Sequence, residues 1–118
     1  MICFTGDGGF YYHLAELETA ARFGINTVIV VNNNASLNQE THLFNEAYGG
    51  QQRGRAGEMW KFHPTNLVQV AEGLGCRGVR VEQPGDLADA LRDAMAADGP
   101  VVIDAISDIE AMAARAWG

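Results

Sequence analysis

The sequence predicts an α/β fold: a parallel, doubly wound sheet in a single domain. Apolar runs rich in Val and Ile alternate with stretches of helical periodicity, which is typical of parallel strands joined by helices. The run at 25–31 is apolar and β-branched without alternation, as expected for a strand buried on both faces, and 101–106 is predicted as a further buried strand. A length of 118 residues suits one domain with a modest core.

The first predicted unit is a strand, a helix and a second strand. The strand covers 1–4, and the helix that follows carries apolar side chains at spacings of four, three and four, namely Phe10, Leu14, Leu17 and Ala21. Gly24 stands where a glycine commonly ends a helix, and the run 25–31 then forms the second strand. One helix between two parallel strands makes a crossover connection.

The middle of the chain, Ala35 to Pro64, shows no clear period. A segment of this length without regular structure is unusual in a compact domain and is either functional or disordered. Trp60 and Phe62 are expected to anchor its end on the core.

Regular structure is predicted again after this segment. We expect a helix from Leu67 that closes at Gly75, a short strand at 79–81, a helix over 87–94 and a strand at 101–106. A last helix is expected from Asp108 to Arg115.

Composition excludes several classes of partner. The chain has 8 basic and 15 acidic residues, a formal net charge of −7, so neither nucleic acid nor an anionic membrane is expected as a partner. No apolar run reaches the roughly 18 residues that a membrane span needs. Cys3 and Cys76 have no paired spacing and are interpreted as buried free thiols of a cytoplasmic protein.

Two polar motifs follow the first two strands. Gly6-Asp7-Gly8-Gly9 comes after the first strand, and Asn32-Asn33-Asn34 comes after the second. Because parallel strands joined by a right-handed crossover end at the same edge of the sheet, Asp7 and the Asn side chains should face one crevice. Carboxylate and amide oxygens suit Mg²⁺, and the glycine N–H groups at a helix start suit a phosphate. The motifs therefore predict Mg²⁺ and a diphosphate bound together.

In these two motifs the chain resembles thiamine diphosphate-dependent enzymes, whose cofactor motif reads GDG and, at a characteristic distance, NN. The family binds Mg²⁺ through the Asp, the second Asn of the pair and the main-chain oxygen two residues later. By this resemblance the metal ligands are Asp7, Asn34 and Ser36. Because three Asn residues occur in a row, Asn33 remains the alternative to Asn34. The cofactor-binding residues implied are Gly6, Asp7, Gly8, Gly9, Asn34, Ser36 and Leu37.

A wider resemblance covers nearly the whole chain. The stretches that carry it are Cys3 to Phe10, Glu16 to Ala20, Gly78 to Val81 and Gly99 to Asp104, which look like the carboxyl-terminal diphosphate-binding domain of acetolactate synthase-type enzymes. Benzoylformate decarboxylase, oxalyl-CoA decarboxylase and glyoxylate carboligase share most of these features. The resemblance implies thiamine diphosphate and Mg²⁺ as cofactors, a 2-oxo acid as substrate, and a homo-oligomer.

The same resemblance implies that part of the enzyme lies elsewhere. In the family a Glu of the pyrimidine-binding domain, usually from a neighbouring subunit, activates the cofactor. We therefore expect the 118-residue chain to be the carboxyl-terminal part of a longer enzyme, and to be inactive alone. A truncated gene product or a separately encoded subunit are the alternatives. No catalytic acid or base is predicted within this chain.

Several further residues keep two interpretations each. Tyr11, Tyr12 and His13 could line the cofactor pocket or pack against another domain, and Glu16 is interpreted as a packing or interface residue. Roles are left open for four residues of the middle segment, Arg53, Arg55, His42 and His63. Arg53 or Arg55 could meet an anionic substrate, although solvated loop arginines are commoner.

Two hypotheses from other functional classes remain. The first is a module that binds Mg²⁺ with another phosphorylated ligand such as a nucleotide, although the sequence has neither GxGxxG nor GxxxxGK[ST]. Competition between thiamine diphosphate and ATP would distinguish the two ligands. The second is an assembly domain with a decayed site, against which Asp7 and Asn34 are both intact.

Overall fold

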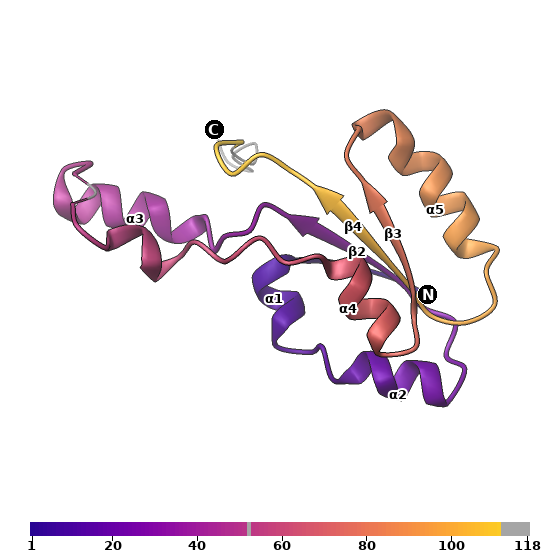
Figure 1. The fold of residues 1–118 in the computed structure, drawn as a ribbon. Helices are drawn as coiled ribbons and strands as arrows, with labels where there is room; N and C mark the ends of the chain where they lie inside the picture. The colour runs from indigo at the N-terminus through magenta and orange to yellow at the C-terminus, as the bar shows by residue number, and fades with distance from the viewer. Residues whose placement is uncertain (52, 112–118) are drawn as a thin grey trace.

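The structure is a computed structural model that describes residues 1–51 and 53–111. Its centre is a four-stranded sheet of order β1-β2-β4-β3 in which every pair of neighbours is parallel (Figure 1). The strands are β1 (Ile2–Gly6), β2 (Val28–Asn33), β3 (Arg77–Val81) and β4 (Val101–Ile106). The predicted parallel α/β fold is thereby confirmed.

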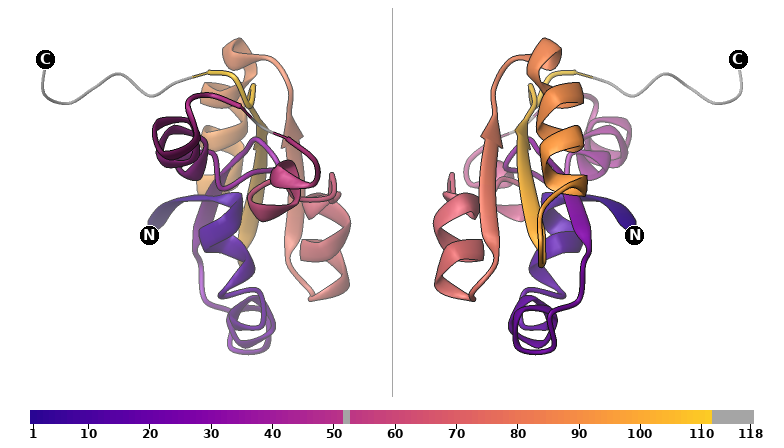
Figure 2. Two further views of the ribbon diagram at one scale, coloured as in Figure 1. Left: turned by 90° about the vertical axis from the view of Figure 1, so that its left-hand side faces the viewer. Right: turned by 90° about the vertical axis from the view of Figure 1, so that its right-hand side faces the viewer.

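Helices cover both faces of the sheet, as a doubly wound arrangement requires (Figures 1 and 2). The chain moves in one direction from β1 to β2 and on to β3, then turns back to insert β4 between β2 and β3. Because crossovers are right-handed, this reversal places the last helix on the face opposite the earlier ones. Accordingly α1 (Asp7–Tyr11), α2 (Glu16–Arg22) and α4 (Leu67–Gly73) lie on one face, and α5 (Leu87–Met95) on the other.

The core consists of two apolar clusters, one on each face of the sheet. The cluster under α1, α2 and α4 is formed by Phe10, Leu17, Val31, Leu67, Ala71, Cys76 and Val102. The cluster under α5 is formed by Val28, Val30, Val81, Ala94, Val101 and Ile103. Because side chains alternate along a strand, adjacent residues of β2 and β4 supply opposite clusters, which explains the consecutive apolar residues 28–31 and 101–103.

The helix predicted over 10–21 is divided into two. Between α1 and α2 the main chain makes four-residue turns, in which the His13 N–H donates to the Phe10 carbonyl and the Glu16 N–H donates to the His13 carbonyl. The apolar spacing nevertheless predicted the buried face correctly, since Phe10 and Leu17 are buried. Gly24 follows α2 at φ +60°, the left-handed conformation in which glycine ends a helix.

The middle segment contains a helix that the sequence analysis missed. α3 (Gln39–Tyr48) begins after Asn38 and ends at Gly49, whose φ is +62°. A 3₁₀ turn, η1 (Ala56–Met59), follows it. The prediction of an irregular segment was therefore wrong. Asn38, a favoured residue before a helix, and Gly49, a favoured residue after one, were the available signals.

Three smaller expectations also need correction or restriction. β2 begins at Val28 and extends through Asn33, because its pairing with β4 continues to the Asn33–Ile106 pair. Cys3 is exposed, because β1 is the edge strand, whereas Cys76 is buried as predicted. At the carboxyl end the predicted last helix does not begin at Asp108: residues 108–111 form a turn in which Asp108 Oδ1 accepts from the Glu110 N–H, and 112–115 lie outside the described residues.

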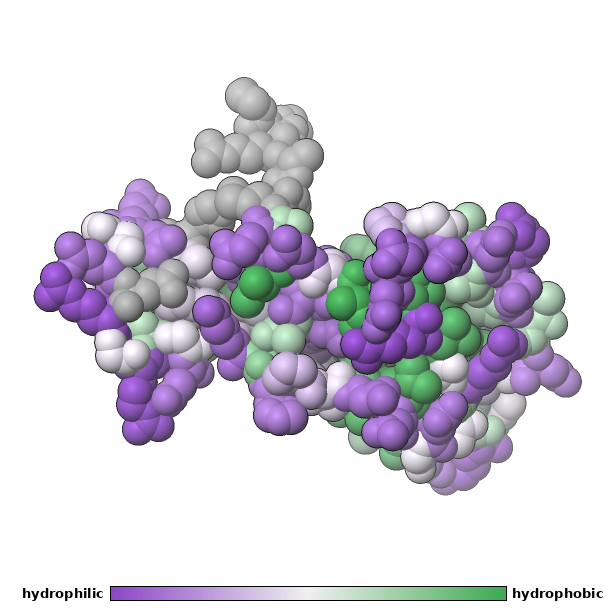
Figure 3. Space-filling model, turned by 45° about the horizontal axis from the view of Figure 1, so that its top comes forward, coloured by the Kyte–Doolittle hydropathy of each residue, from purple (hydrophilic) through white to green (hydrophobic). Residues whose placement is uncertain are grey.

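The helix α3 and the turn η1 together form a lobe that extends away from the sheet, called the α3–η1 lobe below (Figure 1). The principal-axis extents of the molecule, 50 × 29 × 23 Å, reflect this extension. In the space-filling view of Figure 3, strongly hydrophobic surface gathers on the sheet-bearing body, and the lobe is mainly hydrophilic on that side. Within the described part of the chain, no helix has the length and apolarity to cross a membrane.

Candidate cofactor-binding site

Asp7 lies at the carboxyl edge of the sheet, at the first position of α1 directly after β1. Its side chain is 2% exposed. The Gly8 N–H donates to Oδ1 at 2.8 Å, and the Ser36 N–H donates to Oδ2 at 3.0 Å. The second bond joins residues 29 positions apart, so the structure brings Asp7 together with the segment that follows the Asn run.

The carboxyl group of Asp7 is buried without a cationic partner. Among residues 1–51 and 53–111, no Lys, Arg or His forms an ion pair with it. Burial raises the pKa of the Asp7 carboxyl above its usual value, and the N–H groups of Gly8, Ser36 and Ala35 act in the opposite direction. A buried carboxylate is costly unless it is paired or coordinates a metal. The surroundings of Asp7 therefore fit a bound cation.

The three Asn residues have different environments. Asn32 is exposed, Asn33 is 7% exposed, and Asn34 is half-buried just beyond the end of β2. Both ends of the Asn33 amide are occupied: Nδ2 donates to Asp104 Oδ1 at 2.7 Å, and Oδ1 accepts from the Ala35 N–H at 3.1 Å. Asn33 is thus held inside the fold, which favours Asn34 over Asn33 as a ligand at this edge.

Ser36 is fixed by a short antiparallel pairing with the segment that returns from the lobe. Ser36 and Lys61 form an isolated bridge, flanked by hydrogen bonds from Leu37 N–H to the Trp60 carbonyl and from Phe62 N–H to the Ala35 carbonyl. The Ser36 hydroxyl donates to the Trp60 carbonyl at 3.1 Å. Trp60 itself is 2% exposed, which confirms its predicted anchoring role, and its ring contacts Phe44 of α3.

The glycines of the first motif differ in the space around them. A Cβ atom on Gly8 would lie 2.4 Å from Leu37 Cδ2, and one on Gly9 would lie 2.7 Å from Thr5 Oγ1. Apart from Gly6 and its two chain neighbours, no atom of the described residues lies within 4 Å of the corresponding position on Gly6. The Leu37 side chain therefore packs against α1 at Gly8, where a larger residue would displace it. The Gly8 N–H, expected to face a phosphate, is used here to hold Asp7.

The aromatic residues after the first motif separate into two environments. Tyr11 is half-buried and its ring packs edge-on against Phe62, with ring centroids 5.3 Å apart. Tyr12 is 81% exposed, and His13 and Glu16 are exposed as well. Only Tyr11 of this group is thus part of the structure around Gly8, where Phe62 also lies.

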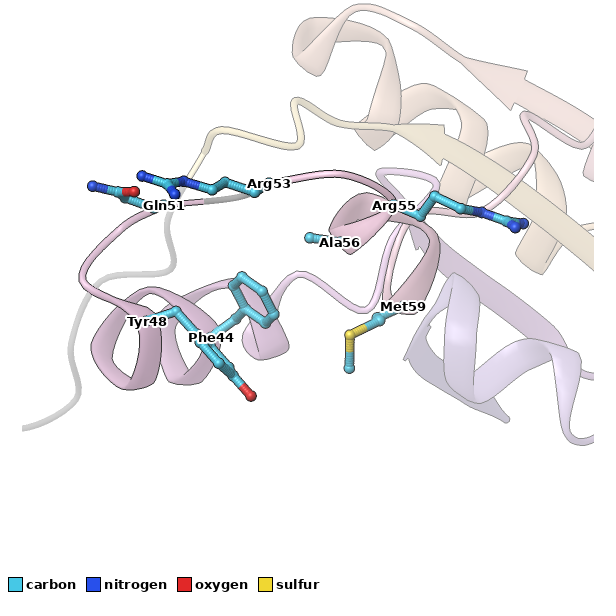
Figure 4. A pocket seen from close by; sticks show the side chains of 7 residues that line it. All are labelled: Phe44, Tyr48, Gln51, Arg53, Arg55, Ala56 and Met59. Carbon is cyan, nitrogen blue, oxygen red and sulfur yellow. The ribbon is translucent and has the colours of Figure 1, made fainter.

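The arginines of the middle segment lie away from Asp7, at a surface cavity of about 530 Å³ in the α3–η1 lobe. The cavity is lined by Phe44, Tyr48, Gln51, Arg53, Arg55, Ala56 and Met59 (Figure 4). Figure 4 shows the two arginine side chains running in opposite directions, and Arg55 pairs with Glu58 at 2.7 Å. Both are exposed, in agreement with the interpretation as solvated loop arginines. His42 falls within α3, and His63 is exposed.

A metal site at this edge does not consist of clustered carboxylates or imidazoles. Within the described ranges no group of three or more His, Cys, Asp or Glu could hold a metal ion. One carboxylate with amide and main-chain oxygens remains, a donor set that suits Mg²⁺ with phosphate and water completing its coordination. The fold defines a parallel, doubly wound α/β domain, a class whose ligands bind outside the carboxyl ends of the strands, where Asp7 and Asn34 lie.

Comparison with known proteins identifies the family. Residues 1–105 match the model of the thiamine pyrophosphate enzyme C-terminal TPP binding domain. The chain therefore belongs to the family of thiamine pyrophosphate enzymes, and it corresponds to their C-terminal TPP-binding domain. The resemblance inferred from the two motifs is confirmed.

Individual relatives come from more than one kind of enzyme. The chain is 36% identical over 104 residues to an acetolactate synthase of Bacillus subtilis, covering 88% of this chain and 17% of that protein. It is 32% identical to a 2-hydroxyacyl-CoA lyase of Arabidopsis thaliana, covering 92% of this chain and 19% of the relative. A solved thiamine diphosphate-dependent 4-hydroxybenzoylformate decarboxylase of Rhodococcus jostii matches with a TM-score of 0.79 and 29% identity, over 91% of this chain and 19% of that one. The chain thus spans less than a fifth of each of these relatives.

Proposed function

We propose that this chain binds Mg²⁺ and the diphosphate end of thiamine diphosphate, as part of a 2-oxo acid decarboxylase or carboligase of the acetolactate synthase type. Enzymes of the benzoylformate decarboxylase, oxalyl-CoA decarboxylase or glyoxylate carboligase type are the alternatives. The family and the mixture of synthase, lyase and decarboxylase among the relatives support this range.

The observation that carries the proposal is the buried, uncompensated carboxylate of Asp7 beside the turn after β2. The two main-chain N–H groups fix both oxygens of the carboxylate, so its orientation is set before any ligand arrives. A divalent cation would compensate its charge, and this agrees with the absence of an ion-paired side chain around Asp7 in residues 1–51 and 53–111.

The chain's own residues would then have distinct tasks. Asp7, the Asn34 side chain and the main-chain oxygen of Ser36 would hold Mg²⁺, and the Gly6–Gly9 segment would lie along the diphosphate. Leu37 would close this end of the site, since it packs on Gly8. When bound, thiamine diphosphate supplies the reactive carbon on which 2-oxo acid chemistry depends, and the protein supplies binding and orientation.

The remaining half of the site would come from a pyrimidine-binding domain of the same or a neighbouring subunit in a homo-oligomer. The chain spans 17% of the Bacillus subtilis acetolactate synthase, so most of such an enzyme has no counterpart here. We therefore expect the 118-residue chain to show no 2-oxo acid turnover by itself.

Calorimetric titration of thiamine diphosphate tests the proposal. Binding is expected with Mg²⁺ present, and it should vanish with EDTA and in Asp7→Ala. Asp98→Ala is the matched control, because Asp98 is exposed and precedes β4 at the opposite edge of the sheet. Binding that persists in EDTA or in Asp7→Ala would contradict the proposed site.

A second titration separates thiamine diphosphate from other phosphorylated ligands. ATP added in excess should not displace thiamine diphosphate if the site is specific for the family's cofactor. Equal displacement by ATP would instead support a general Mg²⁺-phosphate module. Decarboxylation of a 2-oxo acid by the isolated chain would contradict the requirement for a second domain.

A further inference from the structure

Asp104 is a buried carboxylate that none of the tasks above uses. It lies in the middle of β4, between the apolar residues Ile103 and Ala105, and its side chain is fully buried. Oδ1 accepts from Asn33 Nδ2 at 2.7 Å. Oδ2 has no hydrogen-bond partner among the described residues, and Arg80 Nη1 of the neighbouring strand β3 lies 3.5 Å from it. A charged residue in an otherwise apolar central strand calls for a specific reason.

Asn33 connects this carboxylate to the turn at the site. Its Nδ2 is held by Asp104, so its Oδ1 points to the other side and accepts from the Ala35 N–H. The main chain of Asn33 is fixed as well, because its carbonyl accepts from the Ser107 N–H at 2.9 Å. Both contacts come from β4 and the residue after it, 71 and 74 positions away in the sequence.

The turn that Asn33 supports is conformationally unusual. Ala35 has φ +52°, and it is the only non-glycine residue with positive φ in the part of the chain that the structure describes. A residue with a Cβ rarely adopts this conformation unless surrounding contacts impose it. The turn directs the next N–H, that of Ser36, to Asp7 Oδ2, and it positions Asn34 and Ser36 at the sheet edge.

We propose that Asp104 is a positioning residue for the metal site, acting through Asn33 to hold the Asn34–Ser36 turn in the conformation that faces Asp7. The series of contacts runs across three adjacent strands, from Arg80 on β3 through Asp104 on β4 to Asn33 on β2. The metal-binding role of the Asn34–Ser36 turn rests on the proposed function. The contacts that hold the turn are present in the chain without cofactor.

The first experiment compares Asp104→Ala with Ile103→Ala. Ile103 is the preceding residue of β4, equally buried, but it belongs to the cluster on the opposite face under α5. Both variants lose core contacts, whereas only Asp104→Ala frees Asn33. In each folded variant we would measure exchange of the Ala35 amide hydrogen without cofactor, and the Mg²⁺ concentration for half-maximal thiamine diphosphate binding.

Asp104→Ala should speed Ala35 amide exchange by roughly threefold to tenfold, the effect of one lost hydrogen bond. It should raise the half-maximal Mg²⁺ concentration by about tenfold or more, as for groups that orient metal ligands. Ile103→Ala should change neither by more than about twofold. Equal effects of the two substitutions would overturn the proposal, since Asp104 would then contribute only to stability.

A charge exchange provides a second test if Asp104→Ala does not fold. Asn33→Asp alone places two carboxylates face to face and should disturb the turn. Combining it with Asp104→Asn restores the pair with donor and acceptor reversed, because the new carboxylate on β2 can accept from both the new amide on β4 and the Ala35 N–H. Ala35 amide exchange should return to the wild-type rate in the double variant, and failure to return would contradict the proposal.

The thiamine diphosphate titration and the exchange of the Ala35 amide hydrogen test the proposed function and this inference separately. If the wild-type chain bound no thiamine diphosphate, the proposed function would fail on its own titration. Ala35 amide exchange would still decide whether Asp104 holds the turn, because it is measured without cofactor.

Discussion

The carboxyl edge of the sheet and the α3–η1 lobe differ in the sequence separation of the contacts that hold them. At the sheet edge, Asp7 bonds to Ser36 and Asn33 bonds to Asp104, across 29 and 71 positions. In the lobe, hydrogen bonds such as that from the Thr41 hydroxyl to Asn38 and the Arg55–Glu58 pair span three positions. The sheet edge is therefore fixed by the whole fold, whereas the lobe is organised mainly by its own local bonds.

The two regions also differ in the side chains that they place at the surface or bury. The sheet edge holds buried polar groups in set orientations, as a site for a metal and a phosphate requires. The lobe presents mostly exposed side chains, among them Leu43, Tyr48 and Met59, each at least 62% exposed. The two regions are connected by the buried side chain of Trp60 and by the short pairing of Ser36 with Lys61.

The largest effect on the free energy of unfolding is expected when the contact of Trp60 between the lobe and the sheet is removed. Trp60→Ala should lower the free energy of unfolding by about 3–5 kcal/mol, as for other buried aromatic residues, because Trp60 is 2% exposed and packs on Phe44. Tyr48→Ala, in the lobe but 65% exposed, should change it by less than about 0.5 kcal/mol. Urea unfolding measures both values. A loss below about 1 kcal/mol for Trp60→Ala would show that the lobe and the sheet are not coupled through this residue.

An intermediate effect is expected where the segment after the Asn run packs on α1. Gly8→Ala should destabilise the chain by about 1–3 kcal/mol, because the added methyl group would lie 2.4 Å from Leu37 Cδ2. Gly6→Ala is the control: its φ of −82° suits any residue, and no atom lies within 4 Å of the new Cβ. Thermal unfolding of the two variants should differ clearly, and equal melting temperatures would mean that Leu37 moves aside without cost.

The smallest effect concerns the charge of Asp7. Because burial raises the pKa of this carboxyl, the folded state binds a proton more readily than the unfolded state. The contribution of Asp7 to stability should therefore fall as pH rises from the unfolded-state pKa to the raised folded-state pKa. One group changes the unfolding free energy by at most about 1.4 kcal/mol per pH unit.

The pH effect is measured by comparing unfolding of the wild-type chain and Asp7→Asn without metal from pH 3 to 7. The stability difference should shift in favour of Asp7→Asn as pH rises. Saturating Mg²⁺ should stabilise only the wild type. A difference that does not vary with pH would contradict the raised pKa of Asp7.

Most of the sheet could be predicted from the sequence, because strands buried on both faces leave consecutive apolar residues such as 28–31 and 101–103. The motif residues could also be located at one edge, since the handedness of crossovers fixes where Asp7 and Asn34 lie. The helix α3 was missed because its apolar pattern is weak: Leu43 and Tyr48 are exposed, and Phe44 is only partly buried against Trp60. Asn38 and Gly49 were the remaining signals. The roles of Asn33 and Asp104 depend on strand order, which periodicity does not encode.

The position of β4 has a consequence for folding. It is the last strand among the described residues, yet it occupies the interior of the sheet between β2 and β3. Until it inserts, β3 has no strand partner and Asn33 lacks both Asp104 and the Ser107 N–H. Contacts of such long sequence separation are slow to form, because their loops must close first. During synthesis the edge at Asp7 is therefore completed only after β4 has left the ribosome, so cofactor binding would report a fully formed sheet.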